Sequence, residues 1–141
     1  MNTHQITAIL ENDYMTKNMF RGVYPIDQLP LFQPGMYVIN TDEHDEPGQH
    51  WLAIYDKEFF DSYGVPPLDD RIVNFLGGDY TYNVEPLQLQ LSRACGFYCV
   101  YYLLHRARGH SAKDIIDILK YSDSDFVVKR MIYDRYKPLF H

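Results

Sequence analysis

The clearest hydrophobic pattern in the chain follows Cys95. Apolar side chains recur there at every third or fourth position, at Phe97, Val100, Tyr101 and Leu104. This spacing places them on one face of an α-helix. The stretch before Cys95 is polar and contains Ser92, as is typical of the start of a helix. We therefore expect a buried helix that begins near Cys95 and ends before Gly109.

Two shorter stretches upstream have the composition of β-strands. They run over Gly48–Tyr55 and Glu58–Gly64, and the two residues between them fit a tight hairpin turn. In that register Asp61 is the diagonal neighbour of His50 on the same face, about 7–8 Å away. Asp56 lies six residues from His50 along an extended strand, about 20 Å at roughly 3.3 Å per residue. Asp61 is therefore the acid that we expect beside His50.

The rest of the chain predicts further helices and strands. In order, we expect a short helix capped by Asn2 or Thr3, an irregular segment over 14–33, strand Met36–Asn40, helix Asp69–Leu76, strand Tyr80–Leu91, a helix opened by Ser111, and a last helix opened by Ser122 or Ser124 and stopped by Pro138. This order predicts one α+β domain over residues 1–141, with a small mixed or antiparallel sheet packed against the central Cys95 helix and flanked by helices.

Four side chains suggest nucleophilic catalysis. A cysteine in the first turn of a helix has its thiolate favoured by unpaired backbone N–H groups and by the positive end of the helix dipole. Cys95 could then act as nucleophile, with His50 as its base and Asp61 as the group that orients the base. Gln88 offers a side-chain N–H donor for an oxyanion, and Gly96 would leave room for a substrate backbone. Each of these residues also has an ordinary structural explanation when it is taken alone. Cys95 could be a small buried side chain and His50 a structural histidine. Asp61 could be a turn residue and Gln88 an exposed amide. The combination favours catalysis.

These residues stand in motifs that resemble a known family. The motifs are His50-Trp51, the stretch Phe59–Gly64, a glutamine seven residues before the cysteine, Ala94-Cys95-Gly96, and a second cysteine at Cys99. They resemble the active-site blocks of the adenovirus-type (adenain-like) cysteine proteases, which are grouped with the proteases of SUMO and other ubiquitin-like proteins. The resemblance covers about residues 1–110, and the short chain is most similar to the compact forms of virophages and DNA transposons.

The resemblance implies a papain-like core in permuted order and a His50–Asp61–Cys95 triad. It also implies an oxyanion hole formed by the Cys95 backbone N–H and Gln88, with Trp51 and Gly96 bordering the substrate. The chain departs from the family in having Asp61 where glutamate is usual. It also lacks the Pro-Asn pair that usually follows the glutamine, so Gln90 stays open as the alternative oxyanion donor.

The implied activity is that of a cysteine endopeptidase that cleaves capsid or other structural precursors during virion maturation. Two alternatives remain open at this point: an isopeptidase that removes ubiquitin-like modifiers, and a non-catalytic capsid-associated binding domain. The intact triad candidates argue against the second alternative. Relatives of this type are activated by a peptide tethered through a cysteine. Because no cysteine precedes Cys95, we expect any activating peptide here to bind non-covalently.

Charge and composition limit the partners. A net charge of −6 argues against strong nucleic-acid binding, which needs clustered Lys and Arg, although Arg93, Arg106 and Arg108 leave room for a local basic patch.

The acidic loop 42–46 lacks the spacing of a set of metal ligands, so we expect no metal, and the triad chemistry needs no cofactor. Two cysteines, no signal segment and no long apolar run predict a monomeric intracellular protein of the host cell or virion, without membrane binding.

Overall fold

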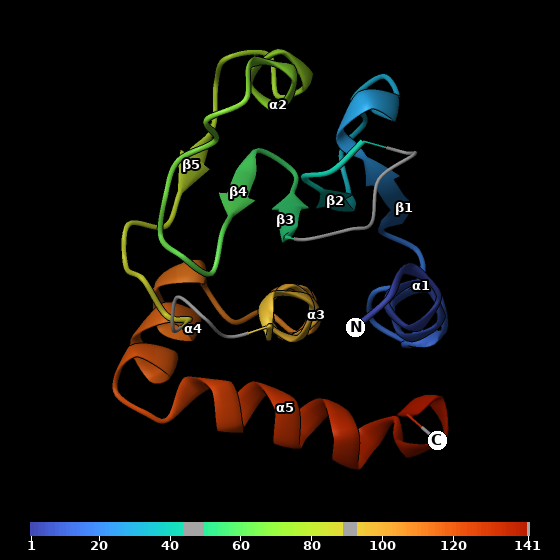
Figure 1. The fold of residues 1–141 in the computed structure, drawn as a ribbon, viewed down its shortest axis with the longest axis vertical. Helices are drawn as coiled ribbons and strands as arrows, with labels where there is room; N and C mark the ends of the chain where they lie inside the picture. Colours follow the sequence, from blue (N-terminus) through green and yellow to red (C-terminus); the bar gives the residue numbers. More distant parts are fainter. Residues whose placement is uncertain (44–49, 89–92, 141) are drawn as a thin grey trace.

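The computed structural model describes residues 1–43, 50–88 and 93–140. Its elements are α1 (Thr3–Asn12), β1 (Phe20–Pro25), η1 (Ile26–Gln28), β2 (Met36–Asn40), β3 (Trp51–Tyr55), β4 (Glu58–Phe60), α2 (Asp70–Phe75), β5 (Thr81–Tyr82), α3 (Cys95–Ala107), α4 (Ala112–Lys120), α5 (Ser124–Arg135) and η2 (Lys137–Phe140). Helices pack against a mixed sheet, so the predicted α+β class is confirmed (Figure 1).

The sheet has the strand order β1-β2-β3-β4-β5. β1 runs parallel to β2 and β5 parallel to β4, whereas β3 runs antiparallel to both of its neighbours, β2 and β4. Tyr55 pairs with Glu58, the register predicted for a two-residue turn. Asp56 takes the left-handed conformation in that turn, with φ of 52°, which aspartate tolerates better than most side chains.

Helix α3 is the centre of the fold. Figure 1 shows it end-on, with the sheet on one side, α5 on the opposite side, and α1 and α4 flanking it. Every residue from Cys95 to Leu104 is buried. Side chains that alternate along the strands, among them Val38, Ala53 and Phe60, join the core around α3, while their neighbours form a second core with α2 and η1 on the other face of the sheet. A helix covered on all sides needs apolar residues all round, as this sequence has.

Four predicted boundaries are wrong. The predicted strand Gly48–Tyr55 begins at Trp51 and does not contain His50, while Gly48 and Gln49 lie outside the described residues. The segment 14–33 is not irregular throughout, because it contains β1, which pairs with β2. Most residues of β1 are half-buried at the sheet edge, and the strand contains Gly22 and ends at Pro25. β1 therefore lacks the alternation of buried and exposed residues that identifies a strand from sequence. The second hairpin strand ends at Phe60 rather than Gly64. Of the predicted strand Tyr80–Leu91, only Thr81–Tyr82 is strand within the described part.

The start of the last helix also differs from the prediction. Asp123 holds the N-cap position of α5 without a side-chain cap bond. Neither Ser122 nor Ser124 caps it, because Ser122 bonds back to α4 carbonyls and Ser124 donates to Leu87. Within the residues that the structure describes, no helix has both the length and the apolar character needed to cross a membrane.

Candidate active site

Cys95 is the first residue of α3 and is 5% exposed. Burial alone raises the pKa of its thiol. Hydrogen bonds from the His50 ring and from the backbone N–H groups of Trp51 and Gly96 oppose burial and leave the pKa below its ordinary value. These are the groups that a thiolate needs: a cationic partner and backbone N–H donors, of which that of Gly96 is in the first turn of α3.

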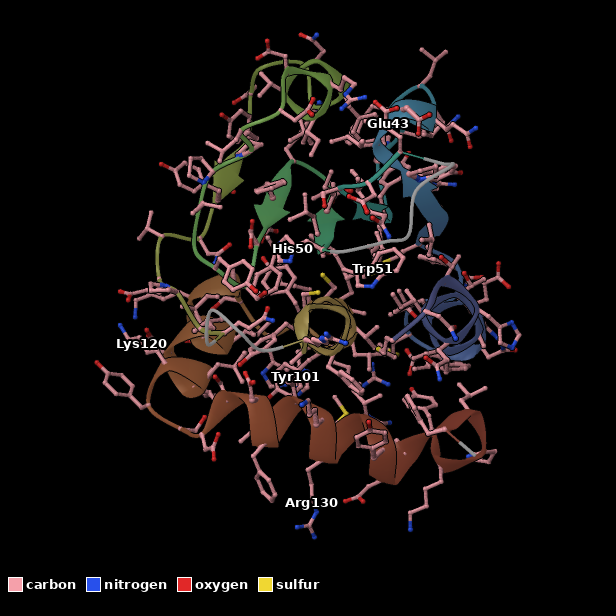
Figure 2. All side chains as sticks on the ribbon, viewed as in Figure 1. Glu43, His50, Trp51, Tyr101, Lys120 and Arg130 are labelled. Atoms are coloured by element: carbon pink, nitrogen blue, oxygen red, sulfur yellow. The ribbon has the colours of Figure 1, made fainter. Side chains whose placement is uncertain are left out.

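His50 lies immediately before β3, where its carbonyl accepts a hydrogen bond of 3.0 Å from the backbone N–H of Thr41. Its Nε2 is 2.9 Å from Oδ1 of Asp61, which leaves Nδ1 as the ring nitrogen that can face Cys95. Burial lowers the pKa of His50, but the hydrogen bonds and charges of Asp61 and Cys95 outweigh it and raise the pKa to about 9. A raised histidine pKa beside a lowered cysteine pKa favours a thiolate–imidazolium pair. Figure 2 shows His50 and Trp51 between the sheet and α3.

Asp61 follows β4 and is 4% exposed. Its Oδ1 also accepts a 2.8 Å hydrogen bond from the backbone N–H of Tyr63. Asn83 holds the Asp61 backbone at both ends: its Oδ1 accepts from the Asp61 N–H at 3.0 Å, and its Nδ2 donates to the Asp61 carbonyl at 2.7 Å. Asp56 is engaged elsewhere, where its Oδ1 accepts from the Gly35 N–H at 2.7 Å. The structure thus places Asp61, and not Asp56, against His50.

Two further residues, not predicted from the sequence, contact the pair. The Tyr63 ring stacks on the His50 ring, with centroids 4.8 Å apart. The hairpin register does place residue 63 opposite residue 50, so this contact had a usable signal. Asn83 had none, because twenty-two residues separate it from Asp61 and only the pairing of β4 with β5 brings them together.

Gln88 is 5% exposed and lies beside Ser62, the residue that follows Asp61. The Ser62 hydroxyl donates to Oε1 of Gln88. The backbone N–H groups of Leu87 and Gln88 donate to the Ser62 carbonyl at 2.8 Å and 3.0 Å. The amide oxygen accepts from Ser62, and the amide nitrogen is the donor group of the Gln88 side chain, the kind of group that an oxyanion hole requires. The alternative donor, Gln90, lies outside the described residues.

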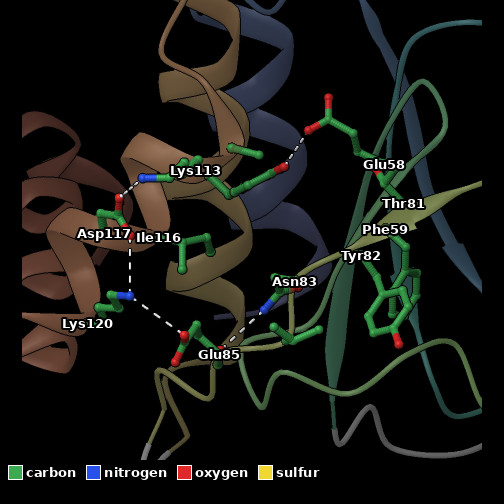
Figure 3. Close-up of a pocket in the computed structure, with 13 residues that line it drawn as sticks. Glu58, Phe59, Thr81, Tyr82, Asn83, Glu85, Lys113, Ile116, Asp117 and Lys120 are labelled. Atoms are coloured by element: carbon green, nitrogen blue, oxygen red, sulfur yellow. Dashed lines mark hydrogen bonds and ion pairs between the residues drawn. The ribbon is translucent and has the colours of Figure 1, made fainter.

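Side chains from three helices hold the segment that carries Gln88. The Leu87 carbonyl accepts hydrogen bonds from Ser124 at 2.8 Å and from Tyr98 at 3.2 Å. Lys120 pairs with Glu85 at 3.6 Å. Figure 3 shows the Lys120–Glu85 pair beside a cavity of about 380 Å³ between β4, β5 and α4, with Asn83 in its wall. These contacts take the place of strand pairing after Tyr82.

Trp51 and Gly96 pack against each other. Trp51 is 7% exposed, and its Nε1 donates to the Met1 carbonyl at 3.2 Å. A Cβ atom at Gly96 would lie 2.9 Å from Met1 Cβ and 3.1 Å from Trp51 Cδ1. The space at Gly96 that the sequence suggested for a substrate backbone is therefore filled by Trp51 and Met1.

Among the described residues, no cluster of three or more His, Cys, Asp or Glu side chains could hold a metal ion. Most of the acidic loop 42–46 falls outside those residues.

The chain matches no protein-family model, and a comparison with curated proteins finds no match.

Proposed function

We propose that this protein is a cysteine endopeptidase in which Cys95 is the nucleophile, His50 the general base and acid, and Asp61 the group that orients His50. The observation that carries the proposal is the double contact of His50. It bonds Asp61 through Nε2 and also interacts with Cys95 at the start of α3. A cysteine, a histidine and a carboxylate joined in this order form an activated nucleophile.

The chemistry follows from that order. The Cys95 thiolate attacks the carbonyl carbon of the scissile bond, and the negative oxygen that forms is stabilised by the Cys95 backbone N–H and the Gln88 amide. The protonated His50 then gives its proton to the leaving amine, which departs and leaves a thioester on Cys95. His50 next accepts a proton from water, and the hydroxide that forms hydrolyses the thioester and regenerates the thiolate.

The proposed substrates are precursors of viral structural proteins, which the enzyme would meet in the infected cell or the assembling virion. The resemblance of the His50-Trp51 and Ala94-Cys95-Gly96 motifs to adenovirus-type proteases supports this substrate class. The appropriate competing substrate is a protein with a ubiquitin-like modifier joined through its C-terminus to a lysine ε-amino group. Faster Cys95-dependent cleavage of that isopeptide bond than of capsid precursors would favour the isopeptidase alternative.

Cleavage of a proteome-derived peptide library, analysed by mass spectrometry, tests the activity. We expect the wild-type protein to generate new termini and Cys95→Ala to generate none. Cys99→Ala is the matched control, because Cys99 is a fully buried cysteine one turn along the same helix. Absence of cleavage by the wild type, or equal cleavage by Cys95→Ala, would contradict the proposal.

Alkylation should distinguish the two cysteines without any substrate. With iodoacetamide at neutral pH, we expect Cys95 to react at least about tenfold faster than Cys99, since reactivity follows the thiolate fraction and exposure. Burial raises the pKa of the Cys99 thiol well above its ordinary value, whereas the pKa of Cys95 is lowered. Peptide mapping of the folded protein measures both rates, and equal rates would contradict the nucleophile assignment.

The pH profile should report the thiolate–imidazolium pair. The pKa of His50 is raised to about 9, so kcat/KM should fall as the pH rises through about 9, where the imidazolium loses the proton that the leaving amine needs. The acid limb should lie below the pKa of about 8.5 of an ordinary thiol, because the Cys95 pKa is lowered. A profile with one rising limb near 8.5 is the result expected of an isolated cysteine, and it would exclude the pair.

A further inference from the structure

A second cavity, of about 310 Å³, lies directly beside the histidine–carboxylate pair. Its walls come from the ends of β2, β3 and β4, from η1 and α2, and from segment 65–69, with His50, Asp61 and Tyr63 at one end. A volume at the lower limit of ligand pockets, which span roughly 300–1,000 Å³, suits one or two side chains of a peptide.

The chemistry of the cavity favours an apolar occupant. Most of its walls are apolar, and they include Ile26, Leu52, Phe59 and Ile72. The charged side chains that line it are already engaged: Asp61 and His50 with each other at 2.9 Å, and Asp69 with Arg71 at 2.9 Å. A charged ligand would therefore lose its water without gaining a partner, whereas an apolar side chain would gain by leaving water.

Segment 65–69 exposes apolar side chains at the edge of this cavity. Val65 is 37% exposed and Leu68 is 81% exposed, and both line the cavity. Pro66 and Pro67 between them fix their own backbone φ angles, and Pro67 is buried. The segment is therefore stiff, so a ligand that covers Leu68 orders little additional chain.

The position of the cavity gives the direction of the substrate. His50 lines it, whereas neither Cys95 nor Gln88 is among the described residues that do. Because His50 must lie within hydrogen-bonding distance of the leaving nitrogen to protonate it, the chain beyond that nitrogen continues past His50 and away from Cys95. The cavity therefore lies on the leaving-group side of the scissile bond.

We propose that this cavity is a specificity pocket for a large apolar side chain that follows the scissile bond, with Leu68 as a specificity-determining residue at its edge. The proposal depends on the proposed peptidase activity and extends it to a substrate class: peptide bonds followed, within two positions, by Leu, Ile, Met, Phe or Tyr. Because burial of an apolar side chain is favourable, partial burial in this cavity is expected to give a preference of about tenfold over small residues.

Cleavage-site profiling of the same peptide library tests the pocket with Leu68→Asp. We expect wild-type cleavage sites to be enriched about tenfold in large apolar residues within two positions after the cut. That enrichment should fall severalfold in Leu68→Asp, because the carboxylate opposes apolar ligands at the pocket edge. Leu31→Asp is the matched control and should keep the wild-type profile, since Leu31 is 91% exposed and does not line the cavity.

The outcomes separate this pocket from the activity itself. Cys95-dependent cleavage with enrichment only before the cut, or with the same enrichment in Leu68→Asp, would overturn the pocket and leave the peptidase intact. Absence of any Cys95-dependent cleavage would overturn the peptidase, and the pocket with it. Loss of enrichment in Leu68→Asp alone, with Leu31→Asp unchanged, would support both.

Discussion

Replacing Asp61 by alanine is expected to lower kcat/KM by roughly 10²–10⁴-fold, the range typical of losing the group that orients a catalytic histidine. Asp61 fixes the His50 tautomer through the 2.9 Å contact at Nε2, and it also contributes to the raised His50 pKa. Without it, Nε2–H loses its acceptor and the imidazolium loses its counter-charge. Both the orientation and the protonation of His50 should suffer.

Asp61→Asn separates these two contributions. In the wild type, Oδ1 accepts from both the His50 ring and the Tyr63 backbone N–H. Because two donors converge on one atom, an asparagine should keep its amide oxygen there and preserve the tautomer while losing the charge. We therefore expect a milder loss in Asp61→Asn than in Asp61→Ala, together with a shift of the alkaline limb of the pH profile to lower pH.

Steady-state kinetics with thermal unfolding of each variant provides the measurement. Asp56→Asn is the control, because Asp56 bonds Gly35 at the hairpin turn and asparagine tolerates its left-handed conformation. Its kcat/KM should stay within about twofold of the wild type, as is usual for a change away from the site. A large loss in Asp56→Asn, with Asp61→Ala unaffected, would contradict the assignment of Asp61 as the orienting acid.

The parts of the fold predicted from sequence are those fixed by local rules. The helix after Cys95 follows from apolar spacing along one continuous segment, and α3 begins at that residue. A two-residue turn at Asp56 fixes the register of the hairpin, and with it the proximity of His50 and Asp61. Neither prediction needed information about residues distant in sequence.

The segment 83–88 could not be predicted in this way. Its polar and apolar residues alternate well enough to suggest a strand, yet its backbone bonds to side chains from elsewhere, as at Ser124 and Leu87. Gly64 depends on the same region: its φ is +72°, and a Cβ atom there would lie 2.6 Å from the backbone of Glu85. Such contacts arise only once β4, α4 and α5 are assembled, so no local pattern records them.

The structure of this segment bears on the choice between Gln88 and Gln90 as the oxyanion donor. In a continuous strand, Gln88 and Gln90 would share a face and alternation could not choose between them. Gln88 is not in a strand, and its amide oxygen accepts from Ser62, which follows Asp61 in the sequence. The same short stretch, Asp61-Ser62, therefore contacts both His50 and the proposed oxyanion donor, which supports Gln88.

If Gln88 donates to the oxyanion, Gln88→Ala should lower kcat by about 10²–10³-fold with little change in KM, because the bond forms fully only in the transition state. Gln88→Glu keeps the length of the side chain but removes the donor, so it should lose as much. Ser62→Ala should reduce the same parameter by less, since it releases the Gln88 amide without deleting it, and it should also lower the unfolding temperature because a buried acceptor loses its donor. Single-turnover rates of these variants beside Gln90→Ala decide the assignment. A severe loss in Gln90→Ala alone, with Gln88→Ala near wild type, would transfer the role to Gln90.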